Sequence, residues 1–162
     1  MMECEIEHCL STHPKTKRVF RGVYALDELP QRHQDGIYIV NTDTRKEPGS
    51  HWLLCYFTAT NRPFYFDSYG LPPLYPELYA FLNNVFEYNK QQIQGINSSV
   101  CGHYVTYIAT QLGHPFPELR KKLFSPTNFE RNDQRICTLF RQEFGYPRYI
   151  INSGKTLSCH SL

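Results

Sequence analysis

The sequence lacks several features that would assign it to a membrane or a secreted class. No apolar run approaches the roughly 18–20 residues that cross a bilayer, and none follows the opening residues MMECEIEHC. We therefore expect no signal peptide, no membrane association and a reducing, intracellular location. The formal net charge is only +2, which permits contact with nucleic acid without requiring it.

Cysteine is present, but without the spacing of a disulfide framework or a strong zinc motif. The six cysteines are Cys4, Cys9, Cys55, Cys101, Cys137 and Cys159. We expect free thiols. Cys4, His8, Cys9 and His13 could each ligate zinc, but their spacing favours a solvated segment, so no metal site and no required cofactor are expected.

The remaining composition is that of one folded domain. The chain has 162 residues, of which 41% are hydrophobic and 15% aromatic, enough to build a core without cross-links. We expect a single domain over residues 1–162, with 1–18 and 151–162 loosely ordered.

Periodicity predicts an α+β fold with a mixed sheet packed by helices. The apolar residues of 51–58 and 63–68 predict a hairpin joined by residues 59–62, in a sheet covered on both faces. The other predicted strands are 37–42 and 88–94, and the predicted helices are 77–86, 100–112 and 128–144.

Cys101 begins the predicted helix 100–112, whose apolar stripe continues through Tyr104, Val105 and Ile108. Unpaired N–H groups at a helix N-terminus stabilise a thiolate and can bind an oxyanion. The backbone N–H of Cys101 is one predicted oxyanion donor, and the side-chain amide of Gln94 is a second.

Two neighbouring features complete this reading of the helix start. Ser98 or Ser99 is the expected helix cap, and Gly102 allows another chain to approach closely.

A nucleophilic thiol needs a base, and the chain has seven histidines. His103 lies two residues along the helix, a rotation of about 200° that turns it away from the thiol. His51 and Asp67 instead face the same side of the predicted hairpin. They form a feasible Cys101–His51–Asp67 triad. Taken one at a time, each residue is more often structural than catalytic.

Three segments resemble a known family when taken together: IVNTDTRKEPGSHWLLCYF, FYFDSYG and IQGINSSVCGHY. They are similar to the adenovirus-type cysteine proteases (adenains), including those of Polinton/Maverick elements, and to the wider clan of SUMO-specific proteases. The resemblance covers roughly residues 19–112. It implies an α+β fold with the nucleophile at the N-terminus of a central helix.

The resemblance also implies roles for individual residues. Cys101 would be the nucleophile, His51 the general base and acid, Asp67 the residue that orients His51, and Gln94 the oxyanion donor. Trp52 would flank the substrate cleft together with Gly102. Adenoviral enzymes carry glutamate in place of the aspartate found here, whereas SUMO proteases carry aspartate, and either carboxylate can accept the imidazole N–H.

The implied function is a monomeric thiol endopeptidase that processes viral or transposon capsid precursors next to small residues such as glycine. Its location would be the host nucleus or the virion. Weak, non-specific DNA stimulation is expected through the basic C-terminal third. No disulfide-linked activator peptide is expected, because residues 67–94 contain no cysteine. The alternatives are a SUMO-type protease and an inactive DNA-binding or virion structural protein.

Overall fold

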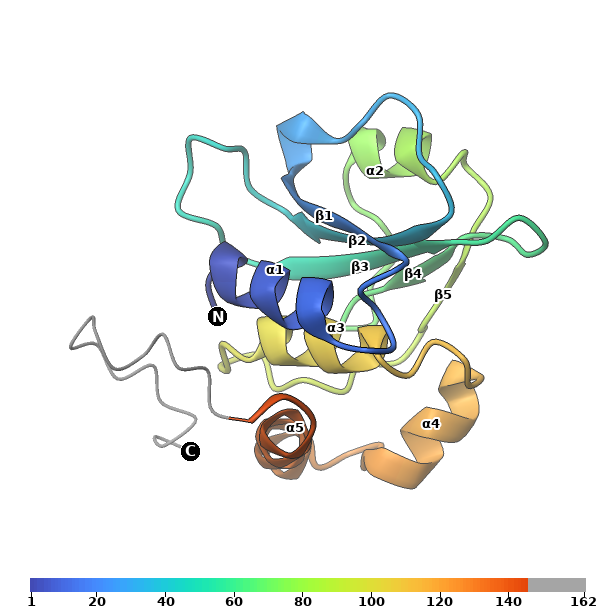
Figure 1. Cartoon of the computed structure of the whole chain (residues 1–162). Coiled ribbons are helices and arrows are strands. Elements are labelled where there is room, and N and C mark those ends of the chain that lie inside the picture. Colours follow the sequence, from blue (N-terminus) through green and yellow to red (C-terminus); the bar gives the residue numbers. More distant parts are fainter. Residues whose placement is uncertain (146–162) are drawn as a thin grey trace.

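One mixed sheet of five strands organises residues 1–145, the part of the chain that the computed structural model describes (Figure 1). The strands lie side by side in chain order. Their bounds are β1 (Phe20–Ala25), β2 (Gly36–Asn41), β3 (Trp52–Phe57), β4 (Phe64–Phe66) and β5 (Glu87–Tyr88). The β1–β2 and β4–β5 pairs are parallel, and the two central pairs are antiparallel.

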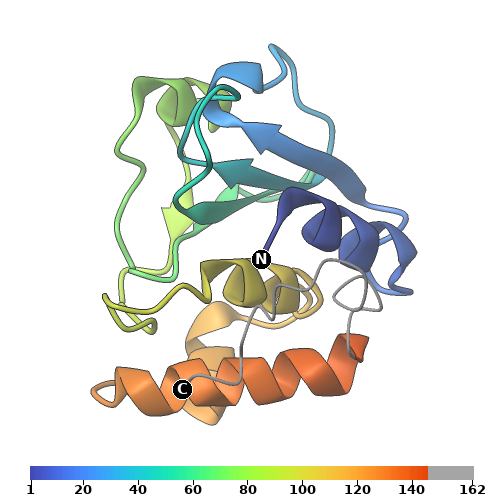
Figure 2. The ribbon, with the colours of Figure 1, turned by 90° about the vertical axis from the view of Figure 1, so that its left-hand side faces the viewer.

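Helices cover both faces of this sheet. They are α1 (Glu3–Thr12), α2 (Pro76–Phe81), α3 (Cys101–Ala109), α4 (Phe116–Leu123) and α5 (Phe129–Phe144). Helices α1 and α3 pack on one face, with α5 beyond α3, while α2 lies over the opposite face (Figures 1 and 2). The fold is therefore α+β with a mixed sheet, as predicted.

Strand alternation divides the core into two parts. In β2, Ile37 and Ile39 point to the layer of α1 and α3, whereas Tyr38 and Val40 point to α2. All four side chains are at most 3% exposed. Because successive residues of a strand face opposite sides, an uninterrupted apolar strand requires cover on both faces, and the predicted coverage is confirmed.

The predicted hairpin is confirmed, and its register positions the residues at its open end. Leu54 pairs with Phe66 and Tyr56 with Phe64. The connecting loop 59–62 is exposed at the far end of both strands. The same register, continued beyond the last ladder pair, brings the residues just before β3 next to those just after β4.

The expectation that residues 1–18 are loosely ordered is wrong, because α1 forms within them. Ile6 and Leu10, one turn apart, are fully buried and join the core on the α3 side of the sheet. Polar residues fill the other faces of this helix, so the short apolar stripe is easily overlooked. The expected looseness of 151–162 lies outside the described residues.

Other differences concern the lengths and number of elements. The strand predicted over 88–94 is only Glu87–Tyr88, and the helix predicted over 77–86 ends at Phe81. Asn83 and Asn84 follow with φ of 56° and 57°, a left-handed conformation that no helix continues through. The helix predicted to end at residue 112 ends at Ala109.

Two elements, β1 and α4, are not anticipated by the sequence pattern. Strand β1 contains Arg21 and Gly22, and α4 is only eight residues long with a basic last turn. By contrast, α5 agrees closely with the predicted helix 128–144. The side chain of Asn128 caps its N-terminus, and Gly145 ends it with φ of 72°.

Burial of α1 makes a direct prediction about stability. Replacing fully buried Leu10 with Ala should lower the free energy of unfolding by about 2–5 kcal/mol, through lost apolar burial and the cavity left behind. Ser11→Ala, at the exposed neighbouring position, should change it by less than about 0.5 kcal/mol. Urea unfolding measures both. Equal, small effects would contradict the packing of α1 against the core.

Candidate active site

A buried hydrogen bond joins His51 to Asp67 across the open end of the β3–β4 hairpin. Nε2 of His51 lies 2.8 Å from Oδ1 of Asp67. The two side chains are only 15% and 5% exposed. His51 immediately precedes β3 and Asp67 immediately follows β4, so the strand register itself brings these side chains together.

The Cys101 thiol meets this pair from the helical layer. Cys101 is the first residue of α3, and its thiol lies close enough to the His51 ring and to the main chain of Trp52 for both to lower the pKa of the thiol. The structure therefore brings together all three residues of the predicted triad.

The charges of the three groups support one another. Burial alone would lower the pKa of His51, but hydrogen bonds to Asp67 and Cys101, and their negative charges, raise it to about 9. Burial would raise the pKa of the Cys101 thiol, but the contact with His51 outweighs it and lowers this pKa. Both shifts favour a thiolate beside an imidazolium, and the thiolate is the reactive form of a cysteine.

Asp67 is held by groups that the sequence reasoning missed. The buried side chain of Asn89 accepts a hydrogen bond from the Asp67 N–H at 2.9 Å and donates one to the Asp67 carbonyl at 2.5 Å. The N–H of Tyr69 donates to the same carboxylate oxygen that faces His51, at 2.8 Å. These contacts fix the carboxylate toward the imidazole.

Tyr69 is a second missed neighbour of the site. Its ring stacks on the His51 imidazole with centroids 4.7 Å apart and planes 26° apart. A flat aromatic ring against a cationic imidazolium restricts ring rotation and favours the charge. The motif letters DSY following β4 are the only sequence signal that could have pointed to this residue.

The loop after β4 is joined to the loop that carries Gln94. The carbonyl of Ser68 accepts hydrogen bonds from the N–H groups of Ile93 and Gln94, at 2.9 and 3.1 Å. Gly70 has φ of 70°, and a Cβ there would lie 2.4 Å from the Gln91 carbonyl carbon. Only glycine permits this close approach of the two chains.

Gln94 is fully buried, and its hydrogen bonds go to these loops. Its Oε1 accepts from the Ser68 hydroxyl at 2.6 Å, and its Nε2 donates to the Ser98 carbonyl at 2.9 Å. A longer contact of 3.4 Å joins Nε2 to the Tyr69 hydroxyl. The hydrogen bonds of the Gln94 amide are thus to Ser68, Ser98 and Tyr69. Its role as an oxyanion donor stays a prediction.

Helix α5 holds the Gln94 loop through the side chain of Asp133. The carboxylate of Asp133, 2% exposed, accepts from the Gly95 N–H at 3.1 Å and the Tyr104 hydroxyl at 3.0 Å. Burial raises the pKa of Asp133, and these hydrogen bonds partly offset that effect. Because Tyr104 belongs to α3, the Asp133 carboxylate connects the Gln94 loop to the helix that begins at Cys101.

The start of α3 differs from expectation in one respect. Val100 is its N-cap residue and no side chain caps the helix, so the expected capping by Ser98 or Ser99 is wrong. The first backbone hydrogen bonds of this turn come from His103 and Tyr104. His103 itself packs edge-on against Phe140 of α5, which places it on the side of the helix away from His51.

The two predicted cleft residues both contact the first residue of the chain. The indole N–H of half-buried Trp52 donates to the Met1 carbonyl at 3.2 Å. A Cβ on Gly102 would lie 2.7 Å from the Met1 Cβ. Met1 therefore occupies the place where the motifs predict a substrate cleft.

The possible zinc ligands near the N-terminus have other surroundings. His13 hydrogen bonds to Glu143 of α5 at 3.1 Å, and burial raises the pKa of Cys9 to about 11. Within residues 1–145, no group of three or more His, Cys, Asp or Glu side chains is placed to hold a metal ion.

No helix of the described residues is long and apolar enough to cross a bilayer.

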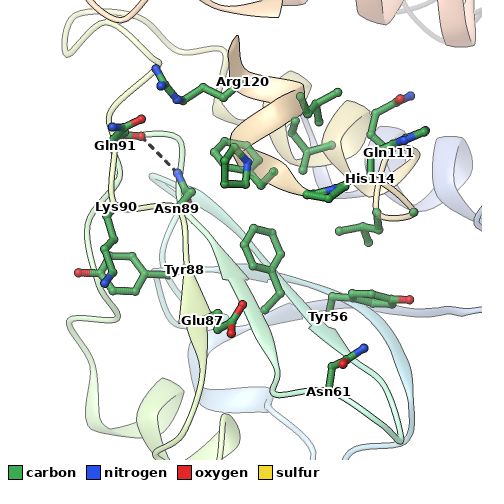
Figure 3. Close-up of a pocket in the computed structure, with 18 of the residues that line it drawn as sticks. Tyr56, Asn61, Glu87, Tyr88, Asn89, Lys90, Gln91, Gln111, His114 and Arg120 are labelled. Atoms are coloured by element: carbon green, nitrogen blue, oxygen red, sulfur yellow. Dashed lines mark hydrogen bonds between the residues drawn. The ribbon is translucent and has the colours of Figure 1, made fainter. Parts of the chain in front are cut away.

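A pocket of about 730 Å³ lies away from the triad, between β5, α4 and the end of α3 (Figure 3). Basic side chains line part of it, namely Arg62, Lys90, Arg120 and Lys121. None of the three triad residues lines it, but Asn89 does. The residue that holds the Asp67 backbone therefore also borders this pocket.

No model of a known protein family matches the sequence, and a search of the curated proteins finds no match. The function proposed below therefore depends on the geometry of the site and on the motifs that carry it.

The coupling of Cys101 to His51 and Asp67 predicts how fast the Cys101 thiol reacts with iodoacetamide. Asp67→Asn removes a negative charge, so the pKa of His51 should fall and that of Cys101 should rise. Alkylation at pH 7 should slow by about tenfold, the equivalent of one pKa unit. Mass spectrometry of the labelled peptide measures the rate.

At a pH high enough to ionise the thiol in both proteins, the rates of the variant and the unaltered protein should become nearly equal. Asp35→Asn, at an exposed position, is the matched control and should react like the unaltered protein. An identical rate at pH 7 in Asp67→Asn would rule out the proposed charge coupling.

Proposed function

We propose that this protein is a thiol endopeptidase with an adenain-like arrangement of sheet and nucleophile helix. The observation that carries the proposal is the buried Cys101–His51–Asp67 relay, in which the pKa of the thiol is lowered and that of the imidazole is raised to about 9. A structural cysteine shows the opposite behaviour, as at Cys55, where burial raises the pKa of the thiol.

The relay supports a two-stage hydrolysis. The Cys101 thiolate attacks the scissile carbonyl carbon and forms a C–S bond, while the carbonyl electron pair moves to oxygen. The Cys101 N–H, and the Gln94 amide if it turns from the Tyr69 hydroxyl, would donate to that oxyanion. His51 gives its proton to the departing amine as the C–N bond breaks.

The second stage restores the enzyme. His51 takes a proton from water, the hydroxide attacks the acyl carbon, and the C–S bond breaks to release the acid and the thiolate. Asp67 accepts the imidazole N–H throughout and stabilises the imidazolium. The Asn89 and Tyr69 contacts serve this step by keeping the carboxylate aimed at His51.

The substrates we propose are viral or transposon capsid precursors cut next to small residues such as glycine. The motif resemblance supports this class, and it implies action in a host nucleus or a virion. The aspartate at position 67 is shared with SUMO-type proteases, so a ubiquitin-like C-terminal reporter should be tested beside a capsid-precursor peptide. Faster cleavage of the reporter would favour the SUMO-type alternative.

Replacing Cys101 with Ala should abolish peptide cleavage and leave the fold intact, because the change removes only a sulfur atom. Cys137→Ala, a change of the same size in the core at α5, should retain activity. Turnover of a glycine-containing peptide and the thermal unfolding midpoint are the measurements. Loss of activity in Cys137→Ala alone would overturn the assignment of the nucleophile.

Activation should not require a disulfide-linked peptide. We expect basal activity in reducing buffer, because residues 67–94 offer no cysteine as an anchor. DNA should raise turnover at most a few-fold, through basic groups such as those in the last turn of α4, and salt should remove the gain. Activity that appears only after a peptide is oxidised onto the protein would contradict this expectation.

A further inference from the structure

Met1 lies where a substrate would have to enter. Its main-chain carbonyl accepts the Trp52 indole N–H at 3.2 Å, and its side chain lies against Gly102. Both are residues that the motifs assign to the cleft beside the nucleophile. With Met1 in this position, Cys101 is only 7% exposed.

The methionine side chain has a shaped site of its own. Its sulfur lies 3.6 Å from the hydroxyl of Thr106, which is fully buried and also donates to the Gly102 carbonyl at 2.7 Å. Gly102 leaves room for the Met1 Cβ, since any side chain there would overlap it. Trp52, Gly102 and Thr106 together form a subsite for an unbranched apolar side chain.

The neighbouring residues hold Met1 at this place. The N–H of Met2 donates to the carboxylate of buried Glu5 at 2.7 Å, in the first turn of α1. Because α1 begins at Glu3 and packs against the core through Ile6 and Leu10, the two residues before it are fixed in place, and Met1 lies against Trp52 and Gly102. Figure 2 shows the N-terminus beside α3, on the side of the sheet that α1 and α3 cover.

We propose that Met1 acts as an intramolecular competitor of substrate, bound in the Trp52–Gly102–Thr106 subsite. This inference rests on the proposed proteolytic function for its kinetic consequence, but not for its effect on the thiol. A substrate that places an unbranched apolar side chain in this subsite displaces Met1. Competition of this kind raises KM and leaves kcat unchanged.

The test uses full-length variants made by removing an N-terminal tag, so that any residue can stand at position 1. Met1→Gly keeps the amino group but removes the side chain. It should lower KM for a peptide substrate by about fivefold to tenfold, the range set by partial burial of one methionine side chain, with kcat unchanged. Norleucine at position 1, an unbranched apolar side chain of the same length that still fills the subsite, should resemble the unaltered protein.

A second readout does not depend on proteolysis. Iodoacetamide should alkylate Cys101 about fivefold to tenfold faster in Met1→Gly than in the unaltered protein. Met2→Ala, at an exposed position outside the subsite, is the control and should leave the rate unchanged.

The two readouts separate the two ideas. Faster alkylation without any peptide cleavage would sustain the occupancy of the cleft and refute the proteolytic function. Cleavage with an unchanged KM in Met1→Gly would sustain the protease and overturn the competition by Met1.

Discussion

The pairing of β3 with β4 is the constraint on which the site depends. It sets His51 and Asp67 at the same end of two short strands, where a hydrogen bond of 2.8 Å joins them. A shift of one residue in this register would turn one of the two side chains to the opposite face of the sheet. The apolar residues that fill both cores therefore also fix the chemistry, because they hold the register.

Cys101 comes from a different layer, so the site also depends on how α3 docks against the sheet. Two buried polar groups govern this docking. Asn89 ties the strand end that carries Asp67 to the following loop, and Asp133 ties the Gln94 loop to Tyr104 of α3. Buried polar groups of this kind are costly unless they are fully paired. Here their partners are backbone groups of Asp67 and Gly95 and the Tyr104 hydroxyl.

Much of this arrangement was predictable from local pattern. The hairpin, the helix that begins at Cys101 and the long helix ending at Gly145 all follow from apolar periodicity and from terminal glycine or asparagine. Within the site, the proximity of His51 and Asp67 follows from strand geometry alone.

The missed features depend on contacts between segments distant in sequence. Asn89 sits in a polar stretch that the pattern reads as a strand, but its side chain bonds to a backbone 22 residues away. Helix α1 has few apolar residues, and only the packing of Ile6 and Leu10 against other elements reveals them as core. The contacts of Met1 with Trp52 and Gly102 join segments far apart in the sequence, and no local pattern predicts them.

The exposed loop 59–62 has a consequence for how this scaffold can diversify. It lies at the opposite end of the hairpin from His51 and Asp67, so its length can change without moving either residue. Exposed loop tips accept insertions readily. Because Asn61 and Arg62 border the pocket beside α4, an insertion here would remodel the lining of this pocket and leave the His51–Asp67 pair in place.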